Sequence, residues 1–532
     1  MRQVALLAKR GRAHPARIAV VEPSLTGGVG AMGSEILLSA LQAAGHDAFR
    51  LRVAPREASQ STLFGPPTTL REPAQVGQLD ALFVSILFPR QYVDVARMLR
   101  WFGVEPLREK RAYTAPLVAF GGQFAIAPAA LAEFADVIAL GDGEATGVEL
   151  ATLLAAGHGR IEIMDEVHGK PGFWCPGKSH AAKMRRLEVL RFQPVVVMPG
   201  TAAATPTIEA ARGCASKCAF CTIGWAGGTY READPAALEQ RLARYRNVAV
   251  NVFAPDLSSV RWDVDEVVER IGCRQMGRDA RMDRARNQLR PGIRSYSFGV
   301  EGLSARLRAL IGKPLSGATI VDVMSRLGAS TAGVVRWYLI VGLPGETDAD
   351  VEEFIGLLHA VREVYAKRLE LTLTMLQPAP HTPLQWLSGV YNGTAAARAM
   401  RIRDACRDAW GSKGEMTSAT MVKGRWLHEY DVALQRADRD AVGFLVDPRT
   451  TEKTTHDERW RDSAESHGLD VDALLETLSP GGTYAWSGVD VGINPGIVLR
   501  QWRRIEADVE TDVRTREKTG GGLESLRDRP PR

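Results

Sequence analysis

The stretch that decides the fold runs from Glu209 to Cys221 and reads Glu-Ala-Ala-Arg-Gly-Cys-Ala-Ser-Lys-Cys-Ala-Phe-Cys. Residues 205–213 have the composition of a strand, so the cysteines Cys214, Cys218 and Cys221 follow a predicted strand end. Three thiolates on one short loop can hold three irons of a 4Fe–4S cube and leave the fourth iron without a protein ligand. The spacing therefore predicts an iron–sulfur centre with an open reaction site.

A zinc site or a chance grouping accounts less well for these cysteines. A zinc site takes four protein ligands, or three and a catalytic water, and His180 and His359 do not supply a second half at suitable spacing. Incidental buried cysteines rarely gather so closely. The chain has six cysteines in 532 residues, which is too few for a disulfide scaffold.

The segment Cys214-Ala-Ser-Lys-Cys218-Ala-Phe220-Cys221 resembles the signature of the radical S-adenosylmethionine (radical SAM) superfamily, in which an aromatic residue precedes the last cysteine. Apolar runs at residues 248–254, 295–300, 335–341 and 371–376 are similar to strands of the partial (β/α)6 barrel of that superfamily. The resemblance implies an enzyme that uses a 4Fe–4S cluster to cleave S-adenosylmethionine (SAM) reductively and functionalises an unactivated carbon. It also implies a reductant such as flavodoxin or ferredoxin.

The resemblance assigns one group of SAM-binding positions after the strand at 295–300. Glu301, Ser304 and Arg306 match the segment that holds the ribose and the carboxylate of SAM in the superfamily. A carboxylate suits ribose hydroxyls, and the guanidinium fork suits a carboxylate. Asp256 stands where the superfamily often places an acceptor for the amine of SAM.

A second group lies in the strand at 335–341 and the loop after it. Ile340 and Gly342 match a motif that packs against adenine. The sequence departs from that motif twice, because Tyr338 replaces its first glycine and Glu346 falls one residue late. The resemblance therefore implies a weaker role for Glu346 than for Ile340 and Gly342.

The N-terminal region alternates apolar runs with helical patterns, which predicts an open, doubly wound parallel sheet. The predicted strands are residues 18–21, 48–53, 81–87, 117–120 and 137–140, and the predicted helices are residues 34–44, 91–102 and 129–134. Glycines follow three of these strands: Gly27, Gly28, Gly30 and Gly33; Gly121 and Gly122; Gly141 and Gly143. Each could serve only a tight turn, but three such turns on one edge indicate a ligand face.

This region resembles the N-terminal cobalamin-binding-like domain of a subfamily of fused radical SAM proteins. Many cobalamin domains supply an axial histidine from Asp-x-His-x-x-Gly, but none of the ten histidines here has an Asp two residues before it. If cobalamin binds, it binds without that ligand. Two possibilities stay open: cobalamin-dependent methyl transfer, or a domain that kept the fold and lost the cofactor.

We expect five segments: a cobalamin-binding-like α/β domain at 1–160, a linker at 161–200, the radical SAM partial barrel at 201–394, a mainly helical region at 395–510 that lids the barrel, and a disordered tail at 511–532. Residues 274–294 are Arg-rich and read as a solvated loop, with phosphate or RNA contact as the alternative. His381 reads as a turn residue, with substrate contact as the alternative. Cys175, Cys273 and Cys406 read as buried or incidental thiols.

Composition excludes several classes of protein. The chain is 45% hydrophobic and 24% charged, with a formal net charge of only +5, so charge alone does not indicate nucleic-acid binding. We find no apolar run of the roughly 20 residues that a membrane helix needs and no signal peptide, and expect a cytoplasmic protein. Two alternatives to cobalamin-dependent methyl transfer remain. One is rearrangement, oxidation or methylthiolation by a radical SAM enzyme without cobalamin, and the other is a non-catalytic RNA-binding iron–sulfur protein. The substrate, whether small molecule, peptide or RNA, is not predicted, and neither are catalytic residues.

Overall fold

The computed structural model describes residues 14–23, 32–53, 78–178, 181–188, 190, 196–197, 206–275, 277–287, 289–411, 414–416, 425–447 and 459–518. Its first sheet has the order β2-β1-β3-β4-β5-β6, with β6 antiparallel and the other neighbours parallel. The strands are β1 (Arg17–Pro23), β2 (Asp47–Val53), β3 (Ala81–Ser85), β4 (Leu117–Gly121), β5 (Val137–Ala139) and β6 (Phe173–Trp174). The predicted parallel sheet is confirmed, with every predicted strand of this region present.

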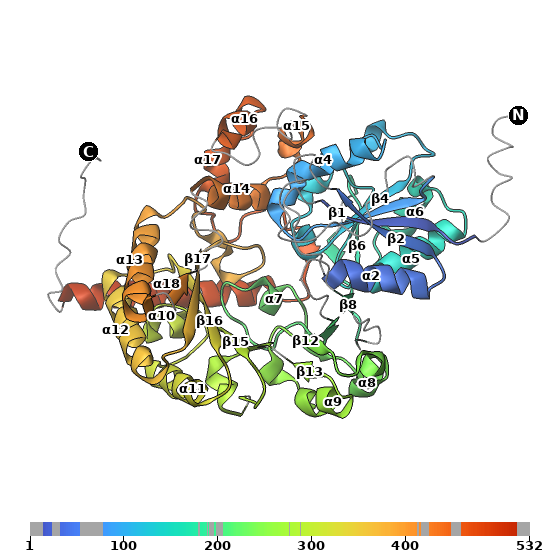
Figure 1. Cartoon of the computed structure of the whole chain (residues 1–532). Helices are drawn as coiled ribbons and strands as arrows, with labels where there is room; N and C mark the ends of the chain where they lie inside the picture. Colours follow the sequence, from blue (N-terminus) through green and yellow to red (C-terminus); the bar gives the residue numbers. More distant parts are fainter. Residues whose placement is uncertain are drawn as a thin grey trace, which may run out of the picture.

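Helices cover both faces of this sheet (Figure 1). They are α2 (Met32–Ala43), α4 (Tyr92–Trp101), α5 (Gly143–Ala155) and α6 (Arg160–Val167). The third predicted helix is reduced to a 3-10 turn, η6 (Ala129–Leu131). The strand order reverses between β1 and β3, and such a switch point opens a crevice at the carboxyl ends of the strands. Gly27, Gly28 and Gly30 lie outside the described residues.

A second body contains parallel strands paired in chain order. They are β9 (Pro206–Glu209), β12 (Ala249–Phe253), β13 (Arg274–Gln275), β14 (Gly277–Ala280), β15 (Ser295–Glu301), β16 (Val334–Val341) and β17 (Arg368–Met375). β13 is the edge strand of a sheet that also contains β12 and β9, while β14 is the edge strand of a sheet that also contains β15, β16 and β17. β13 ends at Gln275 and β14 begins at Gly277, so two consecutive strands of the chain belong to different sheets. The predicted barrel strands are present, in two sheets rather than one continuous barrel wall.

Helices lie between these strands and cover the outer face. They are α7 (Thr222–Trp225), α8 (Pro235–Leu242), α9 (Val264–Arg270), α10 (Ala305–Leu310), α11 (Gly317–Ala329) and α12 (Asp348–Val364). α13 (Gly393–Trp410) packs on α12, and β18 (Gly414–Met416) extends the sheet beyond β17. On the other side β8 (Val196–Val197) pairs antiparallel with β9.

The Arg-rich segment 274–294 is not a solvated loop, and this prediction was wrong. It supplies β13, β14 and the 3-10 turn η9 (Met282–Asn287). Arg278 is buried because its guanidinium meets the carboxylate of Asp265 on α9. Met282 and Ala285 are buried in the core that the outer helices share. Charged side chains with partners can occupy a strand that hydrophobicity alone does not reveal.

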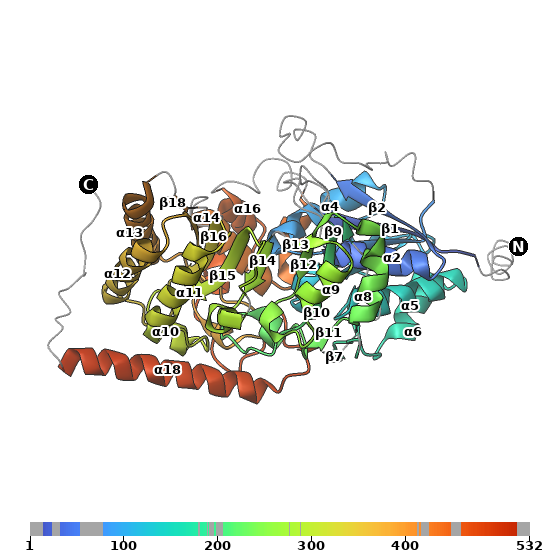
Figure 2. The ribbon, with the colours of Figure 1, turned by 60° about the horizontal axis from the view of Figure 1, so that its bottom comes forward.

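The C-terminal region is mainly helical, as predicted, but it divides between the two bodies (Figures 1 and 2). α14 (Arg425–Arg436), α15 (Val442–Val446), α16 (Trp460–Ser466) and α17 (Val471–Leu475) share a core with α4 of the N-terminal body. They therefore cover the N-terminal body rather than the barrel alone. α18 (Pro495–Lys518) packs along the second body through Val498, Trp502 and Ile505. It continues as helix past residue 511, where a disordered tail was expected.

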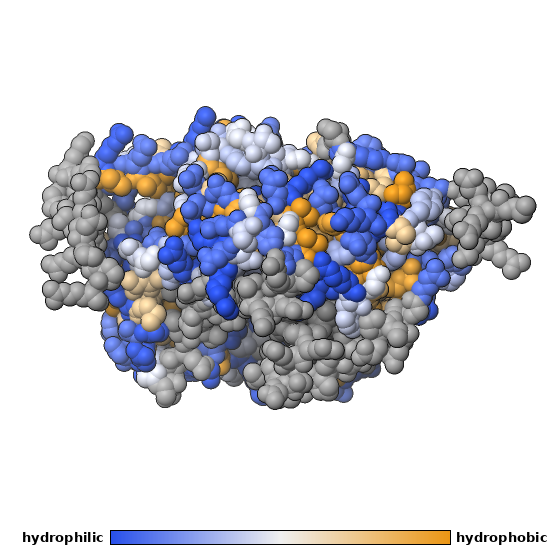
Figure 3. Space-filling model, turned by 90° about the horizontal axis from the view of Figure 1, so that it is seen from above, coloured by the Kyte–Doolittle hydropathy of each residue, from blue (hydrophilic) through white to orange (hydrophobic). Residues whose placement is uncertain are grey.

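The segment predicted as a linker is also structured in its described parts. α6 and β6 belong to the N-terminal sheet and its covering helices. β7 (Ala182–Lys183) pairs with β19 (Val489–Asp490) from the far end of the chain. Within the described part of the chain, no helix combines the length and apolarity needed to span a membrane. The described residues on the face in Figure 3 are mainly hydrophilic, with small hydrophobic patches between them.

Candidate functional site

The three predicted metal-binding cysteines lie together on the loop that joins β10 (Ala211–Arg212) to α7. Cys218 is buried, Cys214 and Cys221 are half-buried, and all three are free thiols. Neighbouring elements fix the loop: the Ala219 amide donates to the Ile311 carbonyl at 2.9 Å, and the Trp225 indole donates to the Cys218 carbonyl at 2.9 Å. The loop is therefore anchored to α7 and to the end of α10.

Positive charge and backbone N–H groups surround these sulfurs. Burial raises the pKa of the Cys221 thiol, and the backbone N–H groups of Gly224 and Ile223 act in the opposite direction. Burial likewise raises the pKa of Cys218, while Lys313 and Arg281 favour its thiolate. Arg281 Nη1 lies 4.0 Å from the Cys218 Sγ atom. The cations and N–H groups therefore offset part of the burial that raises the pKa of both thiols.

No three His, Cys, Asp or Glu side chains of the described residues converge as ligands of one metal ion would. This result does not disfavour a cubane cluster, because each thiolate of such a cluster binds a different iron. The three thiols come from one loop, which follows β9 and β10.

Asp256 lies at the carboxyl end of β12 and is buried. Its carboxylate accepts hydrogen bonds from the Ser258 amide and from the Ser259 hydroxyl, at 3.0 and 2.7 Å. Arg284 adds an ion pair at 3.3 Å. Because these groups already engage both carboxylate oxygens, the geometry gives Asp256 a clear role in capping the turn η8 (Leu257–Ser259).

Glu301 ends β15 in the left-handed region, with φ 67°. Its Oε1 atom lies 3.1 Å from Lys313 Nζ. A Cβ atom at Gly299 would lie 2.1 Å from Glu301 Oε1 and 2.6 Å from Lys313 Nζ, so this ion pair lies directly over Gly299. The pair therefore occupies the inner side of the sheet, and Lys313 also acts on the Cys218 thiol.

Ser304 and Arg306 have contacts of another kind. Ser304 caps α10 and donates to the buried carboxylate of Asp350 on α12. Arg306 binds the other Asp350 oxygen at 2.6 Å and lies 3.3 Å from Asp512 on α18. Arg306 also donates to the Gly345 carbonyl at 2.9 Å, so its described contacts tie α10 to α12, α18 and the loop after β16, and none is with the cysteine loop.

The remaining predicted residues lie near the end of β16 or in the cysteine loop. Phe220 is partly buried against the main core of the second body, and Ile340 is buried in it. Gly342 has φ 81° and donates its amide to Glu346 Oε2 at 2.9 Å. Burial raises the pKa of Glu346 to about 7. Glu346 therefore stabilises the turn after β16 by accepting this hydrogen bond.

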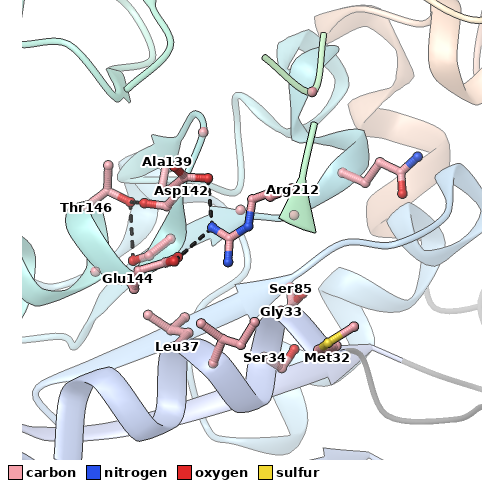
Figure 4. Close-up of a pocket in the computed structure, with 18 of the residues that line it drawn as sticks. Met32, Gly33, Ser34, Leu37, Ser85, Ala139, Asp142, Glu144, Thr146 and Arg212 are labelled. Atoms are coloured by element: carbon pink, nitrogen blue, oxygen red, sulfur yellow. Dashed lines mark hydrogen bonds and ion pairs between the residues drawn. The ribbon is translucent and has the colours of Figure 1, made fainter. Parts of the chain in front are cut away.

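A cavity of about 390 Å³ lies between the carboxyl edge of the N-terminal sheet and the cysteine loop. Gly33, Gly121, Gly122, Gly141 and Gly143 line one side, so the cavity opens at the predicted glycine turns. The other side includes Arg212, Gly213, Thr222, Ile223 and Phe253 of the second body. Apolar side chains of α2 and β3 add to the lining, and Figure 4 shows Leu37 and Met32 beside it.

A buried ion network joins the two bodies at this cavity (Figure 4). Arg212 Nη1 lies 2.8 Å from both Asp142 and Glu144 of the N-terminal body, and Arg212 Nη2 lies 2.7 Å from Glu209. Arg231 binds the second Asp142 oxygen. Burial acts against ionisation of Asp142, but Arg212 and Arg231 outweigh it and lower its pKa. The network thus fixes the glycine turn after β5 against the strand that leads to Cys214.

Two further hydrogen bonds connect the bodies. Gln123, in the turn after Gly122, donates to the Thr222 hydroxyl at 3.3 Å, next to Cys221. The His381 Nε2 atom lies 3.1 Å from the Ile126 carbonyl, and burial lowers the His381 pKa to about 4. A neutral imidazole that donates to this carbonyl is a structural link, in agreement with the turn-residue interpretation.

Sequence reasoning missed Arg281, Lys313 and the acidic partners of Arg212. Arg281 was hidden in the stretch interpreted as a solvated loop. Lys313 lies only a few residues after Arg306, but the family motif assigned a role to Arg306 and none to Lys313. Asp142 and Glu144 lie in the glycine turn Gly-Asp-Gly-Glu at 141–144, where acidic residues among the glycines were the available signal.

Two family models match the sequence. Residues 208–358 match the model described as the Radical SAM superfamily. Residues 55–176 match the model described as Radical SAM proteins, N-terminal. An uncharacterized protein of Methanocaldococcus jannaschii is 27% identical over 191 residues, which cover 34% of this chain and 42% of that protein. The match therefore spans less than half of the length of this curated relative.

Two solved structures share the overall fold. The radical S-adenosylmethionine methyltransferase TsrM from Kitasatospora setae aligns over 93% of this chain and 99% of its own, with a TM-score of 0.50 and 16% identity. The cobalamin-dependent S-adenosylmethionine radical enzyme OxsB, solved with aqua-cobalamin, aligns over 97% of this chain and 82% of its own, with a TM-score of 0.50 and 12% identity. At such identities the likeness concerns the fold.

Proposed function

The chain belongs to the radical SAM enzymes, and we propose that Cys214, Cys218 and Cys221 hold its 4Fe–4S cluster for reductive cleavage of SAM. We propose further that cobalamin occupies the cavity and that the reaction is methyl transfer to an unactivated carbon. The observation that carries this proposal is the shared cavity wall, where the glycine turns of the N-terminal sheet face Thr222 and Ile223, directly after Cys221.

The donor set fits an iron–sulfur cluster. The three thiols come from one anchored loop, and Arg281 and Lys313 bring positive charge to Cys218. Cationic groups and N–H donors around cysteine sulfurs stabilise a cluster that carries net negative charge. A bound cluster would supply the electron that cleaves SAM, with flavodoxin or ferredoxin as its source. The protein's own residues bind, orient and exclude water.

For SAM, the contacts favour a revised set of residues. Glu301 lies at the end of β15 and suits the ribose hydroxyls, and Ile340 and Gly342 suit the adenine. For the SAM carboxylate we favour Lys313 or Arg281 over Arg306, because these two cations act on Cys218; all three are paired in the structure, with Glu301, Asp283 and Asp350 respectively. Phe220, Asp256 and Glu346 support the loops around this set.

The cavity fits cobalamin in two respects. Its glycine turns let the backbone approach a bulky ligand, and its lining is largely apolar. No histidine lines it among the described residues, so cobalamin would bind without a histidine ligand from this cavity. TsrM is a methyltransferase and OxsB is cobalamin-dependent, and the fold that they share with this chain supports the proposal.

The structure gives less support to the alternative functions. Methylthiolation needs a second cluster, but Cys175, Cys273 and Cys406 are each buried in a different part of the molecule. RNA contact by the segment 274–294 is disfavoured because Arg278, Arg281 and Arg290 each pair with an aspartate. Rearrangement or oxidation by a radical SAM enzyme without cobalamin is the remaining alternative.

The proposal is tested by measuring iron and cobalt per chain after anaerobic purification from cells supplied with cobalamin. We expect about four irons and one cobalt, together with a methylated product. About four irons without cobalt would favour the enzyme without cobalamin. Absence of iron after reconstitution would overturn the proposal.

A further inference from the structure

Arg281 is held beside the cysteine loop by a two-point contact with a carboxylate. It follows β14 directly, and its partner Asp283 lies in the turn η9. The Asp283 carboxylate accepts from Arg281 Nε at 3.1 Å and from Arg281 Nη2 at 3.0 Å. Such a bidentate pair fixes the plane and the direction of the guanidinium. The third nitrogen, Nη1, therefore has a fixed position as well.

This third nitrogen points at the loop that carries the three cysteines. It donates to the Ser216 hydroxyl at 3.1 Å and lies 4.0 Å from the Cys218 sulfur. Because Asp283 takes the edge formed by Nε and Nη2, its carboxylate lies on the opposite side of the guanidinium from Nη1. The pair therefore presents its positive end to Cys218.

The two ends of this pair differ in burial. The Arg281 side chain is 11% exposed and the Asp283 side chain is 25% exposed, so water screens the acidic end more than the basic end. Lys313, the other cation that acts on Cys218, is compensated there, because its partner Glu301 shifts the pKa of the Cys218 thiol in the opposite direction. Of these two cations, Arg281 therefore brings the less compensated charge to the sulfur.

We propose that Arg281 raises the reduction potential of the cluster. Reduction adds one negative charge to a cluster, so a cation and an N–H donor beside a ligating sulfur favour the reduced form. Arg281 acts through the Cys218 sulfur and is therefore a positioning residue, which leaves Lys313 as the cation for the SAM carboxylate. The inference rests on the proposed function, because it requires that Cys218 binds the cluster.

The test measures the reduction potential of the reconstituted cluster under anaerobic conditions and without SAM. Mediated redox titration followed by electron paramagnetic resonance gives the ratio of reduced to oxidised cluster at each potential. Arg281→Met removes the charge and keeps an unbranched side chain. We expect this ratio to fall at least tenfold at a fixed potential, which is a shift of about 59 mV to a more negative value for a one-electron couple. An unchanged potential overturns the inference.

A second variant separates charge from damage to the loop. Asp283→Asn removes the acidic end of the same pair and should raise the potential, by less than Arg281→Met lowers it, because Asp283 is more exposed. A loosened loop would shift both variants in the same direction, and that result contradicts the inference. If Arg281→Met does not retain its cluster, Asp283→Asn decides alone, and the absence of a rise overturns the inference.

The matched control is Arg284→Met in the same turn. Arg284 pairs with Asp256 at 3.3 Å and bonds to the Ser259 hydroxyl, its side chain is 47% exposed, and its described contacts do not include the cysteine loop. Its loss should leave the potential unchanged. A shift as large as that of Arg281→Met would mean that any charge removed from this segment has the same effect, against the inference.

Two further measurements separate the possible failures. If Arg281→Met weakens SAM binding tenfold and leaves the potential unchanged, Arg281 serves SAM and the inference is wrong. If the unaltered protein holds no iron after reconstitution, the proposed function fails. If it holds its cluster and the potential does not depend on Arg281, only the present inference fails.

Discussion

The N-terminal sheet and the barrel strands present the same structural position to the cavity, the carboxyl ends of parallel strands, but they place different residues there. The N-terminal sheet ends in glycine turns at Gly121, Gly122 and Gly141 beside apolar side chains. The barrel ends in three thiols with Arg281 and Lys313 nearby. Backbone geometry makes a binding edge in both, and the residue types decide which ligand each edge suits.

The largest expected effect separates the two edges by their ligands. Cys218→Ala should abolish iron binding, because a cubane held by two thiolates lacks the third protein ligand. Cobalt content should stay near that of the unaltered protein, because the glycine turns are untouched. Metal analysis of the anaerobically purified variant checks both values. The control is Cys406→Ala, which removes a buried thiol on α13 and should leave the iron content unchanged. Loss of both cobalt and iron in Cys218→Ala would show that the two edges are not independent ligand sites.

The second prediction concerns the ion network around Arg212, which connects the two edges. Arg212→Met leaves Asp142, Glu144 and Glu209 without their shared cation in a buried setting. We expect the free energy of unfolding to fall by about 3–5 kcal/mol, measured by urea denaturation. Arg261→Met, whose side chain is 84% exposed in its pair with Glu232, should change it by less than about 1 kcal/mol. Similar values for both variants would mean that the network contributes little to the association of the two bodies.

The third effect concerns the glycine edge alone. Gly122 has φ 104°, and a Cβ atom there would lie 2.4 Å from the Ile86 carbonyl oxygen. Gly122→Ala should therefore cost about 2–4 kcal/mol of unfolding free energy and lower cobalt content while iron stays. Gly143→Ala is the matched control, since a Cβ atom there meets nothing within 4 Å. Equal stability of the two variants in thermal unfolding would contradict this account.

The smallest effect is a change in pH dependence at the interface. The His381 pKa is lowered to about 4 by burial, from 6.5 when exposed, so between these values the unfolded chain binds a proton that the folded protein does not. Stability therefore rises with pH from about 4 to 6.5. His381→Asn should flatten part of this rise and lower stability at pH 7 by about 1 kcal/mol through the lost hydrogen bond to Ile126. An unchanged slope in denaturation between pH 4 and 6.5 would assign the dependence to other groups, such as His428.

Periodicity and motif together predicted much of this molecule. The N-terminal strands were readable because buried parallel strands form continuous apolar runs, such as Ala81–Ser85. The cysteine loop was readable because three thiols at that spacing have few other uses. The glycine turns after β4 and β5 indicated the edge of the sheet at which the cavity lies.

Other features depend on partners that are remote in the sequence. β13 and β14 were missed because the charge of Arg278 is buried beside a partner on another element, Asp265 of α9. Arg306 was assigned to SAM by its place in a motif, whereas the fold brings Asp350 to it. The charges that face Cys218 come from two separate segments, so no single stretch of sequence reveals them. Pairing of charges that are remote in the sequence therefore accounts for most of the differences between the sequence-based predictions and the structure.

The path of the chain also bears on how the protein matures. Helices α14 to α17 return to cover α4, and α18 then returns to the barrel. On the ribosome, domains usually fold as they emerge, but here the apolar side of α4 has no cover until residues 425–475 have been synthesised. The nascent N-terminal body thus exposes an apolar, aggregation-prone surface during much of translation. Its demand for chaperones in the cell should exceed what the stability of the finished protein would suggest.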